Sequence, residues 1–158
     1  KEWAITKIQR EILLETKQRY QEKYLQRIIE TTTEYFQVIT DGRFTNVFFP
    51  DGTNTFQVIT EDELMFTVQE LSQGTINQLY VALRLAISKV MAKTHRFPFI
   101  LDDAFVHFDE KRTERMMEVL NRIGKDQQVI LFSCKLDVKQ ACEKLGFPML
   151  EMYHSIQY

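Results

Sequence analysis

The sequence predicts an α/β fold, and three observations support this class. Short apolar runs alternate with segments of helical periodicity over the C-terminal half, which is typical of parallel strands joined by helical crossovers. An aromatic and β-branched stretch in the middle, interrupted by turn residues, predicts an antiparallel hairpin. A polar N-terminal stretch without Gly or Pro predicts one long helix.

The predicted N-terminal helix covers residues 1–35. Apolar residues recur at helical spacing in two short runs that end at Ile12 and Ile28. One interpretation is an amphipathic helix on a domain surface, and the other is the end of a long antiparallel coiled coil. The apolar heptad is not sustained over roughly three or four repeats, which favours the first interpretation. Because the chain begins at Lys1 inside this helix, we expect a piece of a longer protein.

Three strands are predicted in the middle of the chain. Segments 44–49 and 55–60 flank the turn Pro50-Asp51-Gly52-Thr53, and a further strand covers 64–68, where apolar residues alternate after an acidic loop.

The C-terminal half is predicted to alternate helices with buried strands. Helical stripes occur at 79–90, at 116–123 before Gly124, and at 138–145 before Gly146. The continuous apolar run 97–101 predicts a strand buried on both faces, and 129–132 predicts a second buried strand. Segment 147–153 is predicted as a last strand.

Composition excludes several classes of protein. The net charge of −2 gives no general attraction for nucleic acid. Cys134 and Cys142 form neither a disulfide framework nor a metal motif, which favours a reduced, cytoplasmic protein. No apolar run approaches the roughly 20 residues of a membrane span. No Gly-x-x-x-x-Gly-Lys-Ser/Thr loop occurs, so the chain by itself cannot cradle a triphosphate in that way.

Asp102 and Asp103 follow the apolar run 97–101, at the end of a predicted strand where open α/β sheets bind their ligands. One carboxylate there can hold Mg²⁺ through coordinated waters. Its neighbour can orient or deprotonate an attacking water in phosphoryl transfer. The alternative is a strand that ends in two solvated acids.

The segment Leu71-Ser72-Gln73-Gly74-Thr75 precedes the longest predicted helix of the C-terminal half. Ser72 or Thr75 can cap this helix, which is the common role of such residues. A hydroxyl and a glycine amide at a helix N-terminus also make an anion site, because the free N–H groups and the helix dipole favour negative charge. Gly74 would let a phosphate approach the backbone, and Ser72 would add a hydroxyl donor.

In this order and approximate spacing, the motifs resemble those of ABC-type ATPases. Segment 71–75 is similar to their Leu-Ser-Gly-Gly-Glu/Gln signature, and Phe99-Ile100-Leu101-Asp102-Asp103 to their Walker B strand. Asp109 falls where their D-loop aspartate falls, with His107 just before it. The strand 129–132 followed by Ser133 is similar to the strand before their switch histidine.

A narrower resemblance comes from the rest of the chain. The helical lead-in and the Gly42-Arg43-Phe44 hairpin resemble the C-terminal lobe of SMC-like heads of the SbcC and RecN kind. Segment 78–86 and the Leu-Asp-Asp sequence look most like the bacterial YhaN type. The resemblance implies that 1–35 is a coiled-coil end or lead-in helix. It also implies that 36–158 is the C-terminal lobe of a P-loop NTPase-like head with a mostly parallel sheet.

The resemblance also implies a mechanism in which two heads sandwich two ATP molecules. The phosphate loop on the N-terminal lobe of one head would hold each nucleotide, and Ser72, Gln73 and Gly74 of the other head would contact it in trans. Asp102 would support Mg²⁺ through water, and Asp103 would stand at the position of the catalytic acid. His107 and Asp109 would lie at the head–head interface, where Asp109 would couple the two sites.

Two departures from the family pattern bear on hydrolysis. Asp103 stands where the family has Glu, which shortens the reach of the carboxylate by one methylene. The switch histidine is absent, and depending on register its place is taken by Cys134 or Lys135. Lys135 could reach a γ-phosphate as a cation, but it cannot relay a proton at neutral pH as His can.

The leading hypothesis is an ATPase head in DNA repair or chromosome maintenance, inactive without the missing phosphate loop. Its expected partners are the matching N-terminal lobe, a second head and, by family analogy, DNA and a nuclease; a bacterial protein would be nucleoid-associated. A second hypothesis is a non-catalytic scaffold that uses ATP only for dimerisation. A third is a coiled-coil adaptor for a protein partner.

Overall fold

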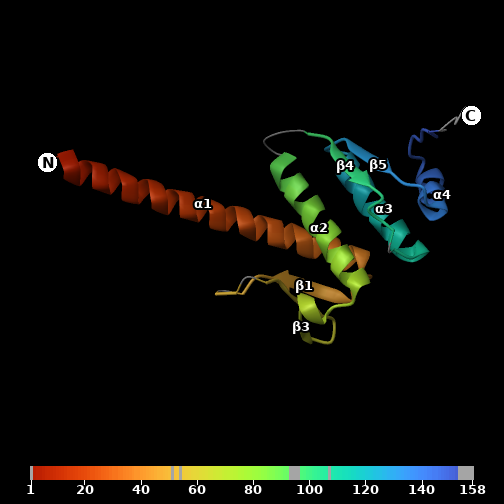
Figure 1. Cartoon of the computed structure of the whole chain (residues 1–158), viewed down its shortest axis with the longest axis horizontal. Helices are drawn as coiled ribbons and strands as arrows, with labels where there is room; N and C mark the ends of the chain where they lie inside the picture. The colour runs from red at the N-terminus through yellow and green to blue at the C-terminus, as the bar shows by residue number, and fades with distance from the viewer. Residues whose placement is uncertain (1, 51, 54, 93–96, 107, 153–158) are drawn as a thin grey trace, which may run out of the picture. The chain divides into compact units, whose positions relative to one another are not determined.

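The computed structural model describes residues 2–50, 52–53, 55–92, 97–106 and 108–152. They form two compact units that divide between Phe97 and Pro98. The first unit contains α1 (Glu2–Ile39), β1 (Phe44–Phe48), β2 (Gln57–Thr60), β3 (Met65–Thr67), the 3₁₀ helix η1 (Val68–Glu70) and α2 (Gln73–Ala92). The second contains β4 (Phe99–Asp102), α3 (Glu110–Gly124), β5 (Val129–Phe132) and α4 (Leu136–Leu145). Figure 1 labels most of these elements along the chain.

The predicted α/β class is confirmed as a mixed fold. Strands β1, β2 and β3 form an antiparallel sheet in that order, and β4 pairs with β5 in a parallel sheet. The expectation of a mostly parallel sheet is therefore met only in part, because three of the five strands in the described residues are antiparallel.

α1 is a continuous helix of 38 residues whose C-terminal part enters the core. Tyr35, Phe36 and Ile39 are buried, and this part packs against α2 and β1. The described side chains before Tyr24 are all exposed, and Leu13 is 70% exposed. In Figure 1 this part of α1 extends beyond α2 and β1 of the same unit. The interpretation of a helix lying on a domain surface therefore does not hold for the N-terminal half of α1.

None of the described helices combines the length and the apolar character that a membrane crossing requires.

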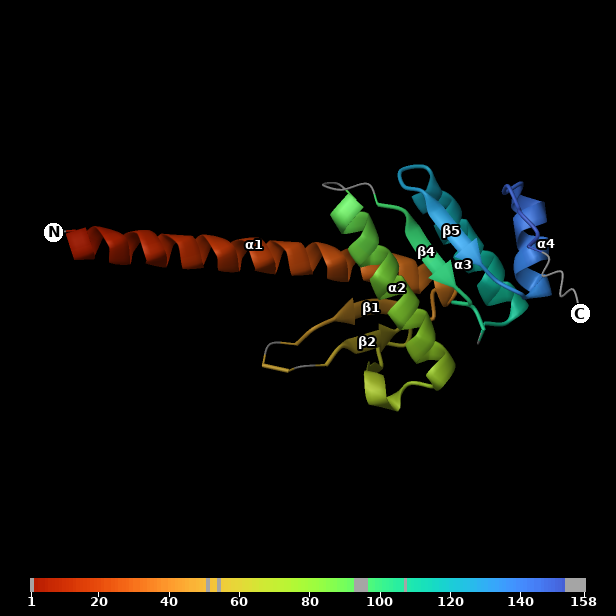
Figure 2. The ribbon, with the colours of Figure 1, turned by 45° about the horizontal axis from the view of Figure 1, so that its top comes forward.

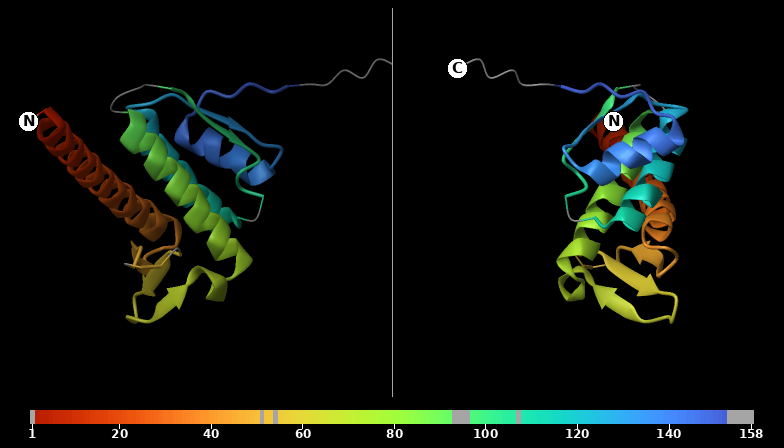
Figure 3. Two further views of the ribbon diagram at one scale, coloured as in Figure 1. Left: turned by 60° about the vertical axis from the view of Figure 1, so that its left-hand side comes forward. Right: turned by 90° about the vertical axis from the view of Figure 1, so that its right-hand side faces the viewer.

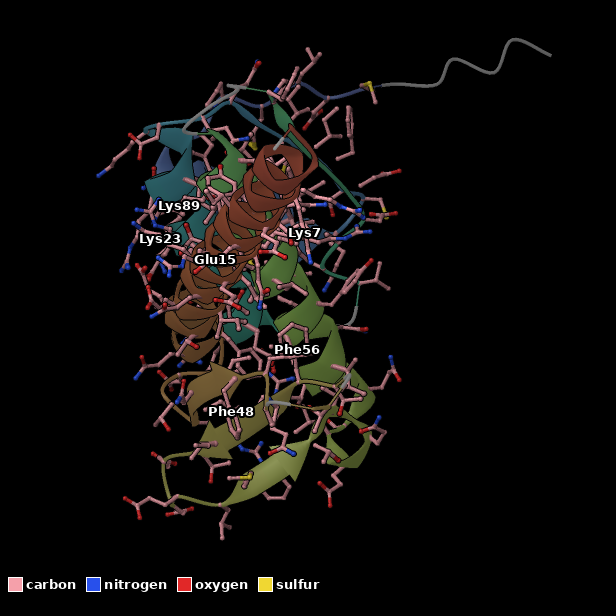
Figure 4. All side chains as sticks on the ribbon, turned by 90° about the vertical axis from the view of Figure 1, so that its left-hand side faces the viewer. Lys7, Glu15, Lys23, Phe48, Phe56 and Lys89 are labelled. Carbon is pink, nitrogen blue, oxygen red and sulfur yellow. The ribbon has the colours of Figure 1, made fainter. Side chains whose placement is uncertain are left out.

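The antiparallel sheet confirms the predicted hairpin. Val47 pairs with Val58, and Val58 pairs with Phe66 on the next strand. In the connecting turn the Thr53 N–H donates to the Pro50 carbonyl at 3.2 Å; Asp51 lies outside the described residues. The rings of Phe49 and Phe56 meet edge to face with centroids 5.2 Å apart, near the end of the hairpin marked by Phe48 and Phe56 in Figure 4.

The third strand is shorter than predicted. It ends at Thr67, and Val68 begins η1 instead of continuing the strand. The reason is a local cap: the Glu70 carboxylate accepts hydrogen bonds from the Thr67 N–H at 2.7 Å and from the Thr67 hydroxyl at 2.8 Å. These bonds turn the backbone into a 3₁₀ helix and direct the chain toward α2.

α2 packs along α1 through its predicted apolar stripe. Leu79, Ala82 and Ala86 are buried, as the helical spacing predicts. The ammonium of Lys89 lies 5.2 Å from the centroid of the Tyr35 ring, and this cation–π contact joins the two helices. Figure 3 shows the antiparallel sheet beside the C-terminal end of α1 and the N-terminal end of α2.

The second unit is built on the pairing of β4 with β5, drawn in Figure 2 as neighbouring arrows that point the same way. α3 buries Met116, Met117, Leu120 and Ile123, which are the four apolar residues that predicted this helix. α4 ends at Gly146, whose φ of 69° makes the left-handed cap expected of a glycine there.

Two predictions about the second unit are wrong. β4 is not buried on both faces: it begins at Phe99, and Ile100 is 59% exposed on one face, whereas Leu101 is buried on the other. Residues 147–152 form no strand, and Tyr153 lies outside the described residues. Pro148 has no N–H to donate to a ladder, and Leu150 is 88% exposed, so no neighbouring strand holds this segment.

Candidate functional site

The two predicted acids lie at the carboxyl end of the parallel sheet. Asp102 is the last residue of β4 and pairs with Phe132, the last residue of β5, so both strands end at one edge. Asp103 follows directly, and its N–H donates to the Phe132 carbonyl at 3.0 Å, which extends the ladder by one residue. Both aspartates are exposed. This edge is where parallel α/β sheets place their ligands.

Asp103 adopts a backbone conformation that is unusual for a residue with a side chain. Its φ is 44°, in the left-handed region. For L-residues this region costs on the order of 1 kcal/mol, and Asp and Asn enter it more readily than others because their short side chains bond locally. The bend turns the chain away from the ladder directly after β4. Strain of this kind gathers at functional sites.

Cys134, one candidate for the switch position, lies beside Asp103. Its Sγ is 4.0 Å from the Asp103 Oδ1, the limit for a hydrogen bond to sulfur, and the thiol is exposed. The contact follows from strand pairing, because Phe132 holds the Asp103 N–H and Cys134 is two residues further along. The structure therefore brings together two residues that the sequence analysis selected from separate motifs.

The Asp102 carboxylate suits a hydrated divalent cation. Among the described residues, no hydrogen bond or ion pair engages its side chain. Mg²⁺ prefers oxygen ligands and keeps several waters, so one or two carboxylates beside a phosphate can hold it. No group of three acidic, His or Cys side chains occurs in the described part of the chain, so a fully protein-made cage is not formed there.

Asp109 has a structural role at the start of α3. Its carboxylate accepts a hydrogen bond from the Arg112 N–H at 2.8 Å and lies 3.4 Å from the Arg112 Nε. It therefore caps the helix in the way expected of an N-cap aspartate. His107, the other predicted D-loop residue, lies outside the described residues.

Lys135, the second candidate for the switch position, points toward the turn that follows β4. Its ammonium donates to the carbonyl oxygens of Phe105 and Phe108 and lies 3.7 Å from the Asp137 carboxylate. Sequence reasoning missed these three residues. The only signals were the Phe-x-x-Phe spacing and an acid two positions after the lysine.

The signature segment forms the N-terminus of α2 in the first unit. The Ser72 hydroxyl accepts a hydrogen bond from the Thr75 N–H at 3.3 Å and lies 2.9 Å from the Thr75 hydroxyl. Ser72 therefore caps the helix, which is the first of the two roles predicted from the sequence. Ser72 and Gln73 are exposed, and Gly74 is half-buried rather than interior.

The same helix end keeps the properties of an anion site. Among the described residues, no acceptor pairs with the N–H groups of Gln73 and Gly74, and the first turn of α2 carries no acid. Two donors and the positive end of the helix dipole therefore remain available. Capping and anion binding are compatible here, because the cap uses a different N–H.

The predicted site residues thus form two groups. Asp102, Asp103, Asp109, Cys134 and Lys135 belong to the second unit, and Ser72, Gln73 and Gly74 belong to the first. The residues of the second unit surround the end of a strand, and the residues of the first unit lie at the N-terminus of a helix.

Comparison with known proteins identifies relatives. No protein-family model matches the chain. The chain is 34% identical over 142 residues to YhaN of Bacillus subtilis (strain 168). This match covers 89% of the chain and 15% of YhaN. The chain is 31% identical over 126 residues to the DNA double-strand break repair Rad50 ATPase of Pyrococcus abyssi (strain GE5 / Orsay), which covers 77% of this chain and 14% of that protein.

Solved structures share the fold. The Smc head domain with a coiled coil and joint from Pyrococcus yayanosii matches with a TM-score of 0.67 and 15% identity, over 87% of this chain and 27% of that chain. A chain described under the ATP-driven dimerisation and DNA-stimulated activation of SMC ATPases matches with a TM-score of 0.66 and 16% identity, over 79% of this chain and 77% of that one.

The comparisons define the class of protein to which the chain is related: it is similar in sequence to YhaN and to Rad50 ATPases, and its fold is shared with SMC head domains. More particularly, it is homologous to YhaN of Bacillus subtilis and to archaeal Rad50 ATPases, which confirms the resemblance found in the sequence. The chain spans 15% of the length of YhaN.

Proposed function

We propose that this chain supplies the C-terminal lobe of a head that binds and hydrolyses ATP between two copies of itself. The observation that carries the proposal is the exposed Asp102–Asp103 pair at the end of a parallel strand, with Asp103 in a left-handed backbone. Homology to Rad50 ATPases supports the same reaction. The proposed setting is DNA repair or chromosome maintenance.

The two aspartates have different proposed roles. Asp102 holds hydrated Mg²⁺, because its carboxylate is exposed at the strand end and engaged by no other group among the described residues. When bound, the ion neutralises charge on the transferred phosphoryl group. Asp103 orients the attacking water and accepts its proton. The bend at Asp103 turns the chain after the strand, and we propose that it offsets the shorter reach of Asp compared with Glu.

The signature segment acts on the nucleotide of the other head. The unpaired N–H groups of Gln73 and Gly74 and the dipole of α2 attract the γ-phosphate, and the Ser72 hydroxyl adds a donor. A site completed from two heads makes ATP a bridge between them, and hydrolysis releases the heads. Asp109, at the start of α3, couples the two sites across the same interface.

The missing phosphate loop belongs to the matching N-terminal lobe. The open face of the parallel sheet supports this partner, because Ile100 is 59% and Phe132 is 42% exposed on it. Ile100 pairs with Ile130, and Phe132 pairs with Asp102, so the apolar residues on this face lead up to the Asp102 carboxylate at the carboxyl end of the sheet. A face of this kind is normally covered by another layer.

The exposed half of α1 supports the coiled-coil interpretation. Ile12, Leu13 and Leu14 are all more than half exposed on a helix that is not covered along this stretch. We propose that an antiparallel helix of the same protein covers them. DNA is proposed as a partner because the archaeal relatives are named for DNA double-strand break repair. A nuclease partner rests on family analogy alone.

The decisive experiment uses the full-length protein. We expect it to bind ATP, to dimerise with ATP and Mg²⁺, and to hydrolyse ATP, whereas this chain alone should do none of these. Ser72→Arg should abolish ATP-driven dimerisation, because a bulky cation replaces the small hydroxyl at the helix end. Asp103→Asn should trap the ATP-bound dimer, because it removes the base but keeps the shape.

Matched controls separate site effects from general damage. Gln140→Arg on α4 adds the same side chain at an exposed position outside both site groups, and Asp126→Asn makes the same acid-to-amide change in an exposed turn. Both should dimerise and hydrolyse ATP like the wild type. Unchanged dimerisation in Ser72→Arg, measured by size-exclusion chromatography with light scattering, would refute the trans signature role.

The two departures from the ABC-type ATPase pattern favour a second function, that of a non-catalytic scaffold. Asp103 replaces Glu, and Cys134 or Lys135 stands where the family has the switch histidine. A head of this kind could use ATP only to dimerise, as a scaffold. Steady-state turnover of the full-length protein decides between the two: dimerisation without turnover supports the scaffold. Absence of any ATP binding would support a coiled-coil adaptor instead.

A further inference from the structure

The side chain of Lys135 crosses from the start of α4 to the turn after β4. Its Nζ donates to the Phe108 carbonyl at 2.7 Å and to the Phe105 carbonyl at 3.1 Å, and it lies 3.7 Å from the Asp137 Oδ2. An ammonium has three donors, and three acceptors surround this one. Only 23% of the side chain is exposed, so these charge-assisted contacts are partly shielded from water.

The turn held by Lys135 joins two of the proposed site residues. It runs from Asp103 at the strand end to Asp109 at the N-cap of α3. The Phe108 N–H donates to the Phe105 carbonyl at 3.0 Å, and their buried rings lie 5.5 Å apart. The rings anchor the turn in the core, whereas the Phe108 carbonyl takes its hydrogen bond from Lys135.

The segment after β5 therefore supports the segment after β4 at three places. The Phe132 carbonyl accepts the Asp103 N–H, the Cys134 thiol lies beside the Asp103 carboxylate, and Lys135 binds the turn. Only the third contact reaches as far as Phe108, the residue directly before Asp109. A buried carbonyl that loses its donor either finds water or moves, so the path between the two aspartates depends on this ammonium.

We propose that Lys135 is a positioning residue for ATP hydrolysis, which fixes the turn between Asp103 and Asp109 instead of contacting phosphate. This inference rests on the proposed function. It differs from the interpretation that Lys135 replaces the switch histidine as a γ-phosphate ligand. A phosphate ligand changes nucleotide affinity, whereas a positioning residue changes the chemical step and the order of the turn.

The test compares Lys135→Met with Lys135→Arg in the full-length protein. Lys135→Met keeps the length of the side chain but removes the ammonium, and Lys135→Arg keeps a charged donor. Lys139→Met is the matched control, because Lys139 lies one turn further along α4 and pairs with the exposed Glu151. Two readouts are measured: steady-state ATP hydrolysis, and hydrogen exchange of the 103–109 backbone amides without nucleotide.

We expect Lys135→Met to lower kcat by on the order of 10- to 100-fold, the size of effect that small displacements of catalytic groups produce. The KM for ATP should stay within about threefold. Exchange of the 103–109 amides should become faster. Lys135→Arg should restore most of both properties, and Lys139→Met should match the wild type.

Several results would overturn the inference. One is unchanged kcat and unchanged exchange in Lys135→Met. Another is a large rise in KM without faster exchange, which would make Lys135 a phosphate ligand. A third is failure of Lys135→Arg to restore either property. If Lys135→Met does not fold, Asp137→Asn takes its place, because it removes the negative charge beside the ammonium and should give a smaller change in the same direction.

Failure of the proposed function is distinguishable from failure of this inference. If the wild-type full-length protein hydrolyses no ATP, the proposed function fails and the link between Lys135 and hydrolysis fails with it. If the wild type hydrolyses ATP but Lys135→Met does so equally well, only the positioning role fails.

Discussion

The Sγ of Cys134 lies 4.0 Å from the Oδ1 of Asp103, although 31 positions separate the two residues in the chain. The pairing of β4 with β5 produces this contact, because Asp102 is held opposite Phe132 and each chain continues past the same edge. A thiol therefore stands beside the carboxylate proposed to activate water.

The first prediction concerns the accessibility of this thiol. Alkylation of Cys134 with iodoacetamide places a bulky amide beside Asp103, so ATP hydrolysis by the full-length protein should slow by on the order of tenfold. Cys142 should react later, because burial raises the pKa of its thiol and thereby lowers the thiolate fraction. Mass spectrometry of the modified sites and turnover of the same samples measure both effects.

The Cys134→Ser variant is the control for this prediction. It keeps a small polar side chain beside Asp103 and should resist inhibition by iodoacetamide. Equal inhibition of the variant and the wild type would show that the reagent acts elsewhere.

The second prediction concerns the backbone of Asp103. Because its φ is 44°, Asp103→Asn should leave the free energy of unfolding within about 0.5 kcal/mol of the wild type. Asp103→Glu restores the family's carboxylate but should cost on the order of 1 kcal/mol, since Glu enters the left-handed region less readily. Urea unfolding followed by circular dichroism measures the difference. Equal stability of the two variants would contradict the argument.

The third prediction separates the structural role of Asp109 from its proposed role between heads. Asp109→Ala removes the acceptor of the Arg112 N–H and should lower the free energy of unfolding by about 1 kcal/mol. Asp109→Asn can still cap the helix and should restore most of this loss. If Asp109→Asn keeps stability but lowers ATP turnover in the full-length protein, the carboxylate has a role beyond capping. Equal loss of stability in both variants would argue against the cap.

The fourth prediction concerns the ion pair that joins α3 to α4. Lys144 donates to the Glu114 carboxylate at 2.8 Å. This bond and the charge of Lys144 hold the pKa of Glu114 below its usual 4.5, and Glu114 in turn raises the pKa of Lys144 above its usual 10.5. The ion pair therefore stabilises the fold at pH values between these two usual pKa values. The stability is lost as pH falls through the folded pKa of Glu114, or rises through that of Lys144.

Glu114→Gln should lower the midpoint of thermal unfolding slightly near neutral pH, because the pair is exposed. The difference from the wild type should vanish once the pH is well below the pKa of Glu114. Glu61→Gln, an exposed change in the other unit, should show no such pH-dependent difference. A difference for Glu114→Gln that persists in acid would contradict the assignment.

Local patterns predicted much of the fold. The hairpin, α2, α3, β5 and α4 follow from apolar periodicity and from turn and cap residues that lie close together in the chain. The order of the motifs also predicted Asp102, Asp103 and the signature segment as site residues from the sequence alone. Their proposed roles in ATP binding and hydrolysis stay predictions.

Features that depend on distant partners were not predictable in this way. The exposure of Ile100 and the missing strand at 147–152 depend on which surfaces another layer covers. An apolar run in the sequence does not indicate whether such a layer packs against it.

The sequence by itself determined most of the helices and strands, and which motifs follow them, because those properties depend on neighbours a few positions apart. The tertiary structure alone decided the left-handed bend at Asp103, its contact with Cys134 and the attachment of Lys135 to the turn before Asp109. The physical reason is that each of these arises where two segments meet after the pairing of β4 with β5, and no local pattern encodes which side chains meet there.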